Sequence, residues 1–344
     1  MSDFVVRLED VFSPKLYTRY NSLDFLTKNV YFNSGVAFAD PRIDRLMGSS
    51  EGGQLIQLPF WNTITEDEPS IASDDPATKI ETSKITSGTE LAAKNFYAKA
   101  FSTMDLAGAL AGSDPMAQII NQIEGYWLNT IDTMVLKSSV GIVADSITNH
   151  DSDLIIDVTA NTGGSYTDLD SKVTADSIID ARGMLGDMQE DCKIMYCHSA
   201  VYTNLQKQDL IETVKNSENN TFFDMYNGMR IIHSDKAPVV SMGSGKYAYY
   251  TFIYGPNVFS LNLGSVPVHE EVERDPSAGN GSGQNKLYTR RSILVHPRGY
   301  KVDDSLITNT KSGLTWDEFA AGTTWTRVYN ERKRIKFVAI KSLG

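Results

Sequence analysis

The run Cys197-His198-Ser199 places a thiol, an imidazole and a hydroxyl on consecutive residues. These groups could perform nucleophilic catalysis, in which a histidine activates a cysteine for attack on an acyl carbon. The nucleophile and its base must be adjacent in space, whereas consecutive residues of a strand point to opposite faces of a sheet. A strand end followed by a helix cap explains the run without any chemistry. A cytosolic hydrolase that uses Cys197 and His198 is therefore kept only as an alternative interpretation.

Metal and phosphate sites are disfavoured by the spacing of their usual ligands. The 5 histidines form no HxH or HExxH pattern, and no acidic stretch has the spacing of an EF-hand. Glycine clusters at 243–245 and 279–283 lack the strand–GxGxxG–helix context that would cradle a phosphate. The acidic run at 270–275 is typical of a solvated face. We expect no catalytic, cofactor-binding or metal site, and therefore no enzyme.

The two cysteines, Cys192 and Cys197, lie five positions apart, which is an odd separation. In the strand that KIMYC predicts, this separation puts them on opposite faces, so they should not form a disulfide. No stretch approaches the roughly 18 apolar residues of a membrane-spanning helix, and the N-terminus has no signal-peptide pattern. The chain is expected to be made in a reducing cytosol and to have no membrane partner.

The length of 344 residues favours two domains, or one domain with large insertions. The 32 Lys and Arg residues against 43 Asp and Glu residues give a net charge of −11. Binding of nucleic acid through its phosphates requires clustered basic residues. A protein of this charge that works near DNA is therefore expected to enclose it, not to grip it.

The first two segments of the chain, residues 1–50 and the hairpin that follows them, have no evident hydrophobic core of their own. Hydrophobic residues within 1–50 are scattered without a sustained period, which predicts an arm packed on another surface. The alternating run QLIQLPFW, an acidic stretch and the run TKIETSKITSGTELAAK then predict a long two-stranded hairpin. An isolated hairpin is marginally stable in water, so one this long implies a partner surface.

The strongest local signal predicts a long helix over residues 115–140. Asp114 or Ser113 can cap its start, and Pro115 suits the first helical position. Apolar residues at spacings of three and four form one face: Met116, Ile119, Ile120, Ile123, Trp127, Ile131, Met134 and Val135. At about 1.5 Å per residue this rod would be roughly 39 Å long, and its apolar face is expected to lie in the core.

Helices and strands alternate beyond residue 150. Helices are predicted over 175–190 and 198–214. The inner face of the first should contain Ile178, Ile179, Leu185 and Met188. Strands are predicted at MRIIHSD, YAYYTFIYG, NVFSLNLG and VPVHEEVERD. A capping box formed by Thr315 and Glu318 precedes a short helix, and the basic run 331–336 is expected on the half-exposed edge of a closing strand.

The run RRSILVHPRGYKV at 290–302 combines arginines, a histidine and a turn. Arg290 and Arg291 should end one strand, and the next residues should carry the chain back towards the long helix. His296-Pro297 should stop the ladder because proline has no N–H, and Gly299 should let the chain turn.

In this order the elements resemble those of tailed-bacteriophage major capsid proteins, whose fold is shared with encapsulin shells and the floor domain of herpesvirus capsids. The hairpin resembles the extended loop that lies over a neighbouring subunit, and DLAGALAGSDPMAQIINQIEGYWLNTIDTMVLKSSVGIVAD resembles the spine helix and its approach. The axial domain of these proteins has a strand, a helix, a glycine-led strand and a strand pair in this order, and a similar order is seen in MYCHSAVYTNLQKQ, YNGMRIIHSDKAP and YTFIYGPNVFSLNLGSVPVHEEVERD. The run RRSILVHPRGYKV resembles the strand that returns to the peripheral domain. The resemblance covers nearly the whole chain.

The resemblance implies an α+β fold of four parts. These are an N-terminal arm (1–50), an extended two-stranded loop (51–95), a peripheral domain (96–150 and 286–344) with its spine helix at 115–140, and an axial domain (151–285). It also implies a structural protein that self-assembles into the hexamers and pentamers of an icosahedral head, which encloses double-stranded DNA without sequence-specific binding. An encapsulin-like compartment shell is a second interpretation within the same fold.

The same resemblance implies synthesis in the host bacterial cytoplasm, residence in the virion, and a scaffolding protein, a portal and a decoration protein as candidate partners. Apolar residues of the hairpin and arginines of the run 290–302 are candidates for contact between subunits, although they form no specific motif: Leu55, Ile56, Leu58, Phe60, Trp61, Ile80, Ile85, Arg290, Arg291 and Arg298. Some family members cross-link subunits through a loop lysine, and Lys79, Lys84 and Lys94 lie in or near the loop. The sequence does not identify their partners.

Overall fold

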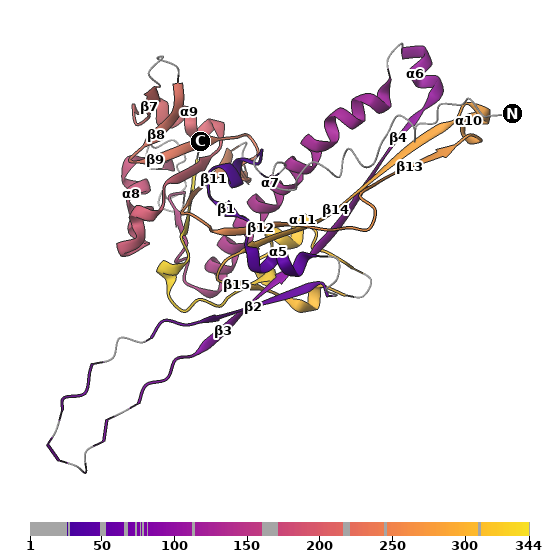
Figure 1. Ribbon diagram of the computed structural model, residues 1–344. Helices are drawn as coiled ribbons and strands as arrows, with labels where there is room; N and C mark the ends of the chain where they lie inside the picture. The colour runs from indigo at the N-terminus through magenta and orange to yellow at the C-terminus, as the bar shows by residue number, and fades with distance from the viewer. Residues whose placement is uncertain are drawn as a thin grey trace.

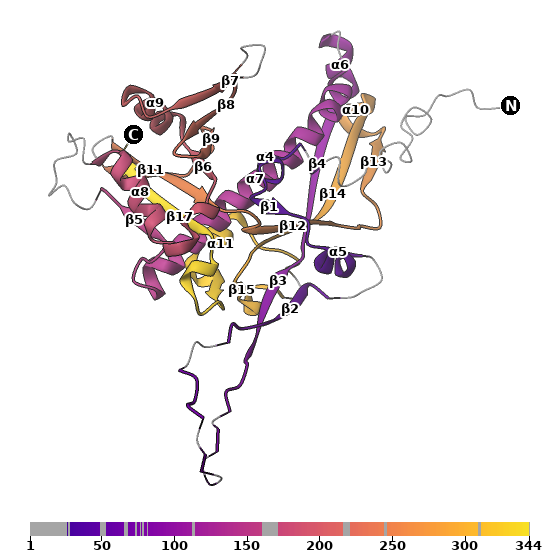
Figure 2. The same ribbon diagram turned by 60° about the vertical axis from the view of Figure 1, so that its left-hand side comes forward.

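The computed structural model describes residues 26, 28–48, 53–64, 68–72, 74, 75, 77, 79, 80, 82–111, 114–159, 171–215, 221–243, 246–308 and 311–343. The first part of the predicted arm, residues 1–25, lies outside the described residues. Helices and strands are mixed along the chain, and the strands form three sheets. This is the α+β class expected from the sequence. Figures 1 and 2 show the sheets arranged around one long helix, α7.

The helix α7 spans Pro115–Asn149 and starts as predicted. The side chain of Asp114 accepts a hydrogen bond from the backbone N–H of Met116 at 2.9 Å. The predicted end at residue 140 was wrong, and the helix is roughly 52 Å long at about 1.5 Å per residue. Residues in the added turns, including Gly141 and Ile142, are buried. Tertiary packing therefore extends the helix beyond the point that its own sequence favours.

The first sheet follows the order β1–β12–β14–β13, and β4 pairs with the opposite side of β14. Its strands are β1 (Ala37–Phe38), β4 (Asn95–Met104), β12 (Phe259–Gly264), β13 (Glu270–Asp275) and β14 (Gln284–Pro297). We predicted that Arg290 and Arg291 end a strand and that His296-Pro297 stops the ladder. Both predictions were wrong, because β14 continues through the two arginines and its ladder with β12 includes Pro297. The missing N–H of Pro297 is tolerated at the end of the strand. Gly299 has a φ of 85° and turns the chain as predicted.

The second sheet follows the order β5–β17–β11–β6–β9–β8–β7, and β10 lies beside β11. Its strands are β5 (Ile155–Asp157), β6 (Ile194–Cys197), β7 (Glu212–Lys215), β8 (Thr221–Tyr226), β9 (Met229–His233), β10 (Val239–Gly243), β11 (Lys246–Tyr254) and β17 (Phe337–Leu343). The predicted edge position of the closing strand was wrong, because β17 lies between β5 and β11. The basic run before it contains the 3₁₀ helix η6 (Arg332–Arg334) instead of strand.

The helices that alternate with these strands are shorter than predicted. Helix α8 (Ala175–Gly183) is followed by the 3₁₀ helix η3 (Gly186–Asp191), and α9 (Ser199–Lys207) ends before β7. On the predicted inner face, Ile178 and Leu185 are buried but Ile179 is 52% exposed. Because α8 ends at Gly183, the helical spacing does not continue to Leu185, which reaches the core from a turn.

Both cysteines are free and buried. The prediction that they face opposite sides was wrong, although alternation does hold within β6. Tyr196 packs in one hydrophobic cluster, whereas Met195 and Cys197 pack in another. Cys192 joins the cluster of Cys197 because the strand begins only at Ile194, so strand alternation does not extend to it.

The third sheet follows the order β16–β15–β3–β2. Its strands are β2 (Leu55–Trp61), β3 (Ser87–Ala93), β15 (Tyr300–Val302) and β16 (Trp325–Arg327). The other short helices are α4 (Val30–Asn33), α5 (Pro41–Met47), α6 (Asp105–Ala111), α10 (Ala278–Gly281), η4 (Asp304–Leu306), α11 (Trp316–Ala320) and η5 (Gly322–Thr324). The capping box of Thr315 and Glu318 forms at the start of α11 as predicted. None of the described helices has the length and hydropathy that a membrane crossing requires.

The end of α7 packs directly on the segment that carries α11 and η5. A Cβ added to Gly141 would lie 2.3 Å from the carbonyl oxygen of Phe319, and one added to Gly322 would lie 2.8 Å from the backbone of Ala144. The indole N–H of Trp325 donates to the same Phe319 oxygen at 2.9 Å. Trp325 begins β16, so this contact holds the long helix against the sheet that contains the hairpin strands.

Candidate subunit interface

The hairpin begins as a regular antiparallel pair and then leaves the sheet. Strands β2 and β3 pair from Leu55 and Ala93 to Trp61 and Ser87. One further bond, from the N–H of Asn62 to the carbonyl of Thr86 at 2.9 Å, follows. The described residues of the hairpin beyond it belong to no strand. Figures 1 and 2 show this outer part extending away from the three sheets in both views.

Two of the ten predicted contact residues are covered by their own chain. Ile56 and Leu58 are 6% and 4% exposed, and they pack in one cluster with Ile43, Met47 and Leu294. These partners come from α5 and β14. The alternation in β2 separates its two faces correctly, but the covered face is not available to a neighbouring subunit.

The exposed apolar residues lie further out along the hairpin. Trp61, Ile80 and Ile85 are 65%, 75% and 49% exposed. Ile64 and Ile71 are 67% and 88% exposed and were not predicted, because they stand singly in polar surroundings without a period. We call these five the apolar hairpin residues.

The predicted residues Leu55 and Phe60 are half-buried at the start of the hairpin. The ring of Phe60 contacts Tyr329 edge to face, with centroids 5.1 Å apart. These two side chains therefore belong to the junction between the hairpin and the body of the molecule.

The three predicted arginines have different surroundings. Arg290 Nη2 is 2.9 Å from Glu271 Oε2, and Arg291 Nη2 is 3.0 Å from Glu270 Oε1. Both pairs join β14 to β13 within one chain, so these two charges already have partners. The guanidinium carbon of Arg298 instead lies 5.4 Å from the ring centroid of Phe38.

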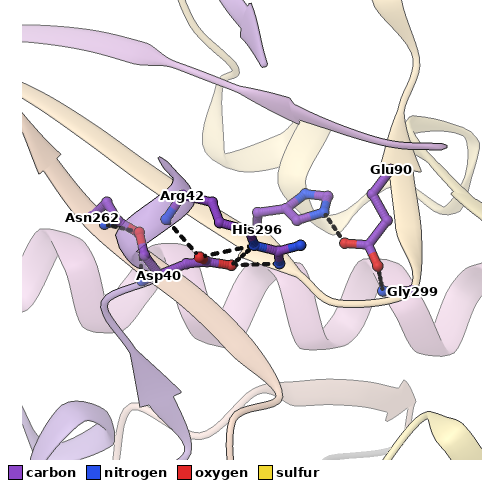
Figure 3. A network of polar contacts seen from close by, with 6 residues as sticks. All are labelled: Asp40, Arg42, Glu90, Asn262, His296 and Gly299. Atoms are coloured by element: carbon purple, nitrogen blue, oxygen red, sulfur yellow. Dashed lines mark hydrogen bonds and ion pairs between the residues drawn. The ribbon is translucent and has the colours of Figure 1, made fainter. Parts of the chain in front are cut away.

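The base of the hairpin is anchored through a buried carboxylate (Figure 3). Glu90 of β3 accepts hydrogen bonds from His296 Nε2 at 3.3 Å and from the backbone N–H of Gly299 at 3.2 Å. His296 is fully buried and Glu90 is 5% exposed. Burial raises the pKa of Glu90, but the hydrogen bonds from His296, Tyr329 and Gly299 act in the opposite direction, and the pKa lies below its usual value.

A second set of contacts fixes α5 beside this carboxylate. The backbone N–H of Asp40 donates to Asn262 Oδ1 at 3.2 Å, and Asn262 Nδ2 donates back to the carbonyl of Asp40 at 3.1 Å. The Asp40 side chain caps α5 by accepting from the N–H of Arg42 at 2.9 Å. Segments far apart in the sequence therefore meet at the hairpin base. Sequence reasoning missed Glu90, because a single glutamate in a strand forms no pattern.

The three lysines near the hairpin are of two kinds. Lys94 is 5% exposed, its Nζ donates to the carbonyl of Met47 at 3.4 Å, and burial lowers its pKa. Lys79 and Lys84 are exposed. Cross-linking through any of the three stays a prediction.

The geometry around Cys197 does not fit a nucleophile and its base. Cys197 is fully buried, and burial raises the pKa of its thiol to about 12, which disfavours the reactive thiolate. His198 Nδ1 accepts a hydrogen bond from the N–H of Ala200 at 3.1 Å, so the imidazole serves as the cap of α9. The hydroxyl of Ser199 donates to Asp235. Within the described ranges, no three His, Cys, Asp or Glu side chains gather as metal ligands.

Comparison with known proteins links the whole chain to phage capsids. No family model matches the chain. It is 29% identical over 335 residues to the major capsid protein of Bacillus phage SPP1, and the match covers 97% of both chains.

The structure is similar to the capsid of Ralstonia phage GP4, with a TM-score of 0.60 and 11% identity over 100% of this chain and 98% of the other. It is also similar to the head structure of Helicobacter pylori bacteriophage KHP40, with a TM-score of 0.52 and 10% identity over 92% and 91% of the two chains. The chain therefore has the fold of phage capsid proteins, and the resemblance predicted from the sequence is confirmed.

Proposed function

We propose that this chain is the major capsid subunit of a tailed bacteriophage. Its copies assemble into the hexamers and pentamers of an icosahedral head, which encloses double-stranded DNA. The observation that carries the proposal is the hairpin, which exposes Trp61 at the end of β2 and four further large apolar side chains beyond it, and whose described residues beyond Asn62 and Thr86 form no strand. Such an extension is marginally stable alone, so it requires the surface of a neighbour.

The energetics favour association through the hairpin. Full burial of one large apolar side chain contributes about 1.5–3 kcal/mol. Five such residues on each copy, repeated around a ring, would make a large part of an obligate interface. The buried contacts of Glu90 fix the hairpin at its base, so less freedom is lost when the outer part docks.

We also propose a division of the subunit into parts. The first sheet, β15, β16 and α7 form the peripheral domain, the second sheet with α8 and α9 forms the axial domain, and residues 51–95 form the extended loop. This differs from the bounds expected from the sequence, because β12 and β13 join the peripheral domain and β17 joins the axial domain. The net charge of −11 suits a container that must not adhere to its packed DNA. A scaffolding protein, a portal and a decoration protein are the expected partners, and the virion is the expected location after synthesis in the host cytoplasm.

Electron microscopy of the purified chain, alone and with the scaffolding protein of its phage, tests the function. Shells, or rings of five or six copies, are expected. The matched variant lacks residues 62–86 and joins Trp61 to Ser87 through Asn-Gly, a turn that suits a two-residue hairpin. It keeps the buried base of the hairpin and should fold without assembling.

Two outcomes would contradict the proposal in different ways. Only small discrete oligomers of the full chain, under both conditions, would refute the shell function. Normal shells from the shortened variant would leave the function in place but would remove the hairpin from the interface.

A further inference from the structure

Two arginines, Arg298 and Arg334, lie near the ring of Tyr329 at the base of the hairpin. We call them the arginine cluster. The guanidinium carbon of Arg334 lies 4.5 Å from the ring centroid of Tyr329, and Gly299, which follows Arg298 in the chain, is so close to the same ring that an added Cβ would lie 2.7 Å from it. Tyr329 in turn contacts Phe60 of β2. The cluster therefore lies where the hairpin leaves the body.

The arginine cluster can receive anionic groups. A guanidinium stacked on an aromatic ring uses its face and leaves the N–H groups at its edge available. Within the described residues, neither Arg298 nor Arg334 has an ion pair, and each lies over a ring. The neighbouring carboxylates of Asp40 and Glu90 are 3% and 5% exposed and are occupied by contacts of their own.

The far end of the hairpin carries the opposite charge. Glu68, Asp74 and Asp75 are exposed there, and we call them the acidic tip. Asp75 Oδ1 accepts a hydrogen bond from the N–H of Ala77 at 2.9 Å, as in a local turn. In a chain with a net charge of −11, copies repel one another unless an acidic surface meets a basic one.

In this structure the hairpin carries the acidic tip away from the arginine cluster of its own chain (Figures 1 and 2). The ten residues from Trp61 to Ile71 span roughly 33 Å when extended, and Figures 1 and 2 show the hairpin directed away from its base. We infer that the acidic tip of one copy binds the arginine cluster of the next copy. This inference rests on the proposed function and names the surface that receives the hairpin. A contact between two different surfaces closes into a ring when its repeated rotation returns to the first copy.

Charge reversal tests the pairing. Glu68→Lys/Asp74→Lys/Asp75→Lys reverses the acidic tip, and Arg298→Glu/Arg334→Glu reverses the cluster. Each set alone should lower the yield of assembled particles at least about tenfold, because like charges then face each other. Both sets in one chain should restore the yield to within about threefold of the natural chain. Lys193→Glu/Lys207→Glu changes the net charge as the cluster variant does, on exposed residues that precede β6 and end α9, and should assemble normally.

Cross-linking provides a measurement that does not depend on the folding of the reversed variants. Arg298→Lys/Arg334→Lys keeps the positive charges and introduces amines that a carbodiimide can couple to carboxylates. Particles assembled from mixed light and heavy isotope chains should yield a mixed-isotope peptide that joins the acidic tip to a new lysine. Its absence from intact particles would overturn the inference, as would normal assembly of the tip variant. Failure of the natural chain to form rings or shells would instead refute the proposed function.

Discussion

The ionised carboxylate of Glu90 joins the hairpin to the first sheet, so its stability contribution depends on pH. Its pKa in the folded chain lies below the value in an unfolded chain, which is about 4.3. Ionised Glu90 therefore stabilises the fold above that value, and the contribution is lost as the pH falls through the folded-state pKa. We predict that Glu90→Gln lowers the free energy of unfolding by about 3 kcal/mol at pH 7, and by less near pH 3 than at pH 7. Urea denaturation of the unassembled subunit measures both values.

Glu68→Gln is the matched control for Glu90→Gln. Glu68 is exposed on the hairpin, and its substitution should change the free energy of unfolding by less than about 0.5 kcal/mol at either pH. An equal loss for Glu90→Gln at pH 7 and near pH 3 would mean that the shape of the side chain, not its charge, is what the site requires.

Sequence reasoning succeeds at the residue scale where the signal is local. Alternation along β2 correctly separates Ile56 and Leu58 from Gln57, because side chains of a strand alternate between faces. The alternation does not reveal that α5 covers Ile56 and Leu58, because the sequence of α5 carries no signal that links this helix to β2. Glu90 was missed for the same reason: its partners His296 and Gly299 are brought to it only by the fold.

At the scale of elements, the helix α7 shows the same difference between local signals, which the sequence reveals, and tertiary contacts, which it does not. Its start is specified locally by Asp114 and Pro115, and it was predicted correctly. Its end depends on close contact with α11 and η5, which no periodicity in residues 138–149 reveals. The hydroxyls of Ser138 and Ser139 bond back to the carbonyls one turn earlier, so even unfavourable helix residues are accommodated within the core.

The basic run before β17 was misplaced on a strand edge because its charges suggested exposure to solvent. Arg332 is instead used inside the chain, where its Nε donates to the carbonyl of Asp153 at 2.7 Å. Burial lowers the pKa of this arginine to about 10. The arginine thereby ties the segment after β16 to the turn that follows α7, and β17 enters the interior of the second sheet.

Close packing of α7 predicts opposite effects for two glycines of one helix. A Cβ at Gly141 would meet the Phe319 carbonyl oxygen at 2.3 Å and the Trp325 Nε1 at 2.6 Å, whereas nothing lies within 4 Å of a Cβ at Gly125. We expect Gly141→Ala to lower the free energy of unfolding by about 3 kcal/mol and Gly125→Ala to raise it by up to about 1 kcal/mol. Urea denaturation of both variants checks this. Similar small effects at the two positions would contradict the direct backbone contact.

The molecule combines a body held together by buried contacts with a hairpin whose described outer residues are mostly exposed. In the body, α7 contacts the elements of the third sheet through Gly141 and Trp325, and the first and second sheets share its hydrophobic cluster. Among the described residues of the hairpin, paired backbone contacts end at Asn62 and Thr86. This asymmetry suits a subunit whose fold is complete in the body and whose hairpin is completed by the next copy.

Hydrogen exchange should show this division directly. Buried, hydrogen-bonded amides exchange slowly, whereas amides without such bonds exchange at once. In the free subunit, amides at 63–64 and 82–85 should therefore exchange within seconds, and those at 131–143 of α7 should be protected. In assembled shells the hairpin amides should slow at least about tenfold, while those of α7, the internal control, should change little. Exchange at 63–64 and 82–85 that is equally fast before and after assembly would mean that the neighbour does not cover the hairpin, and the interface would then have to lie on the body.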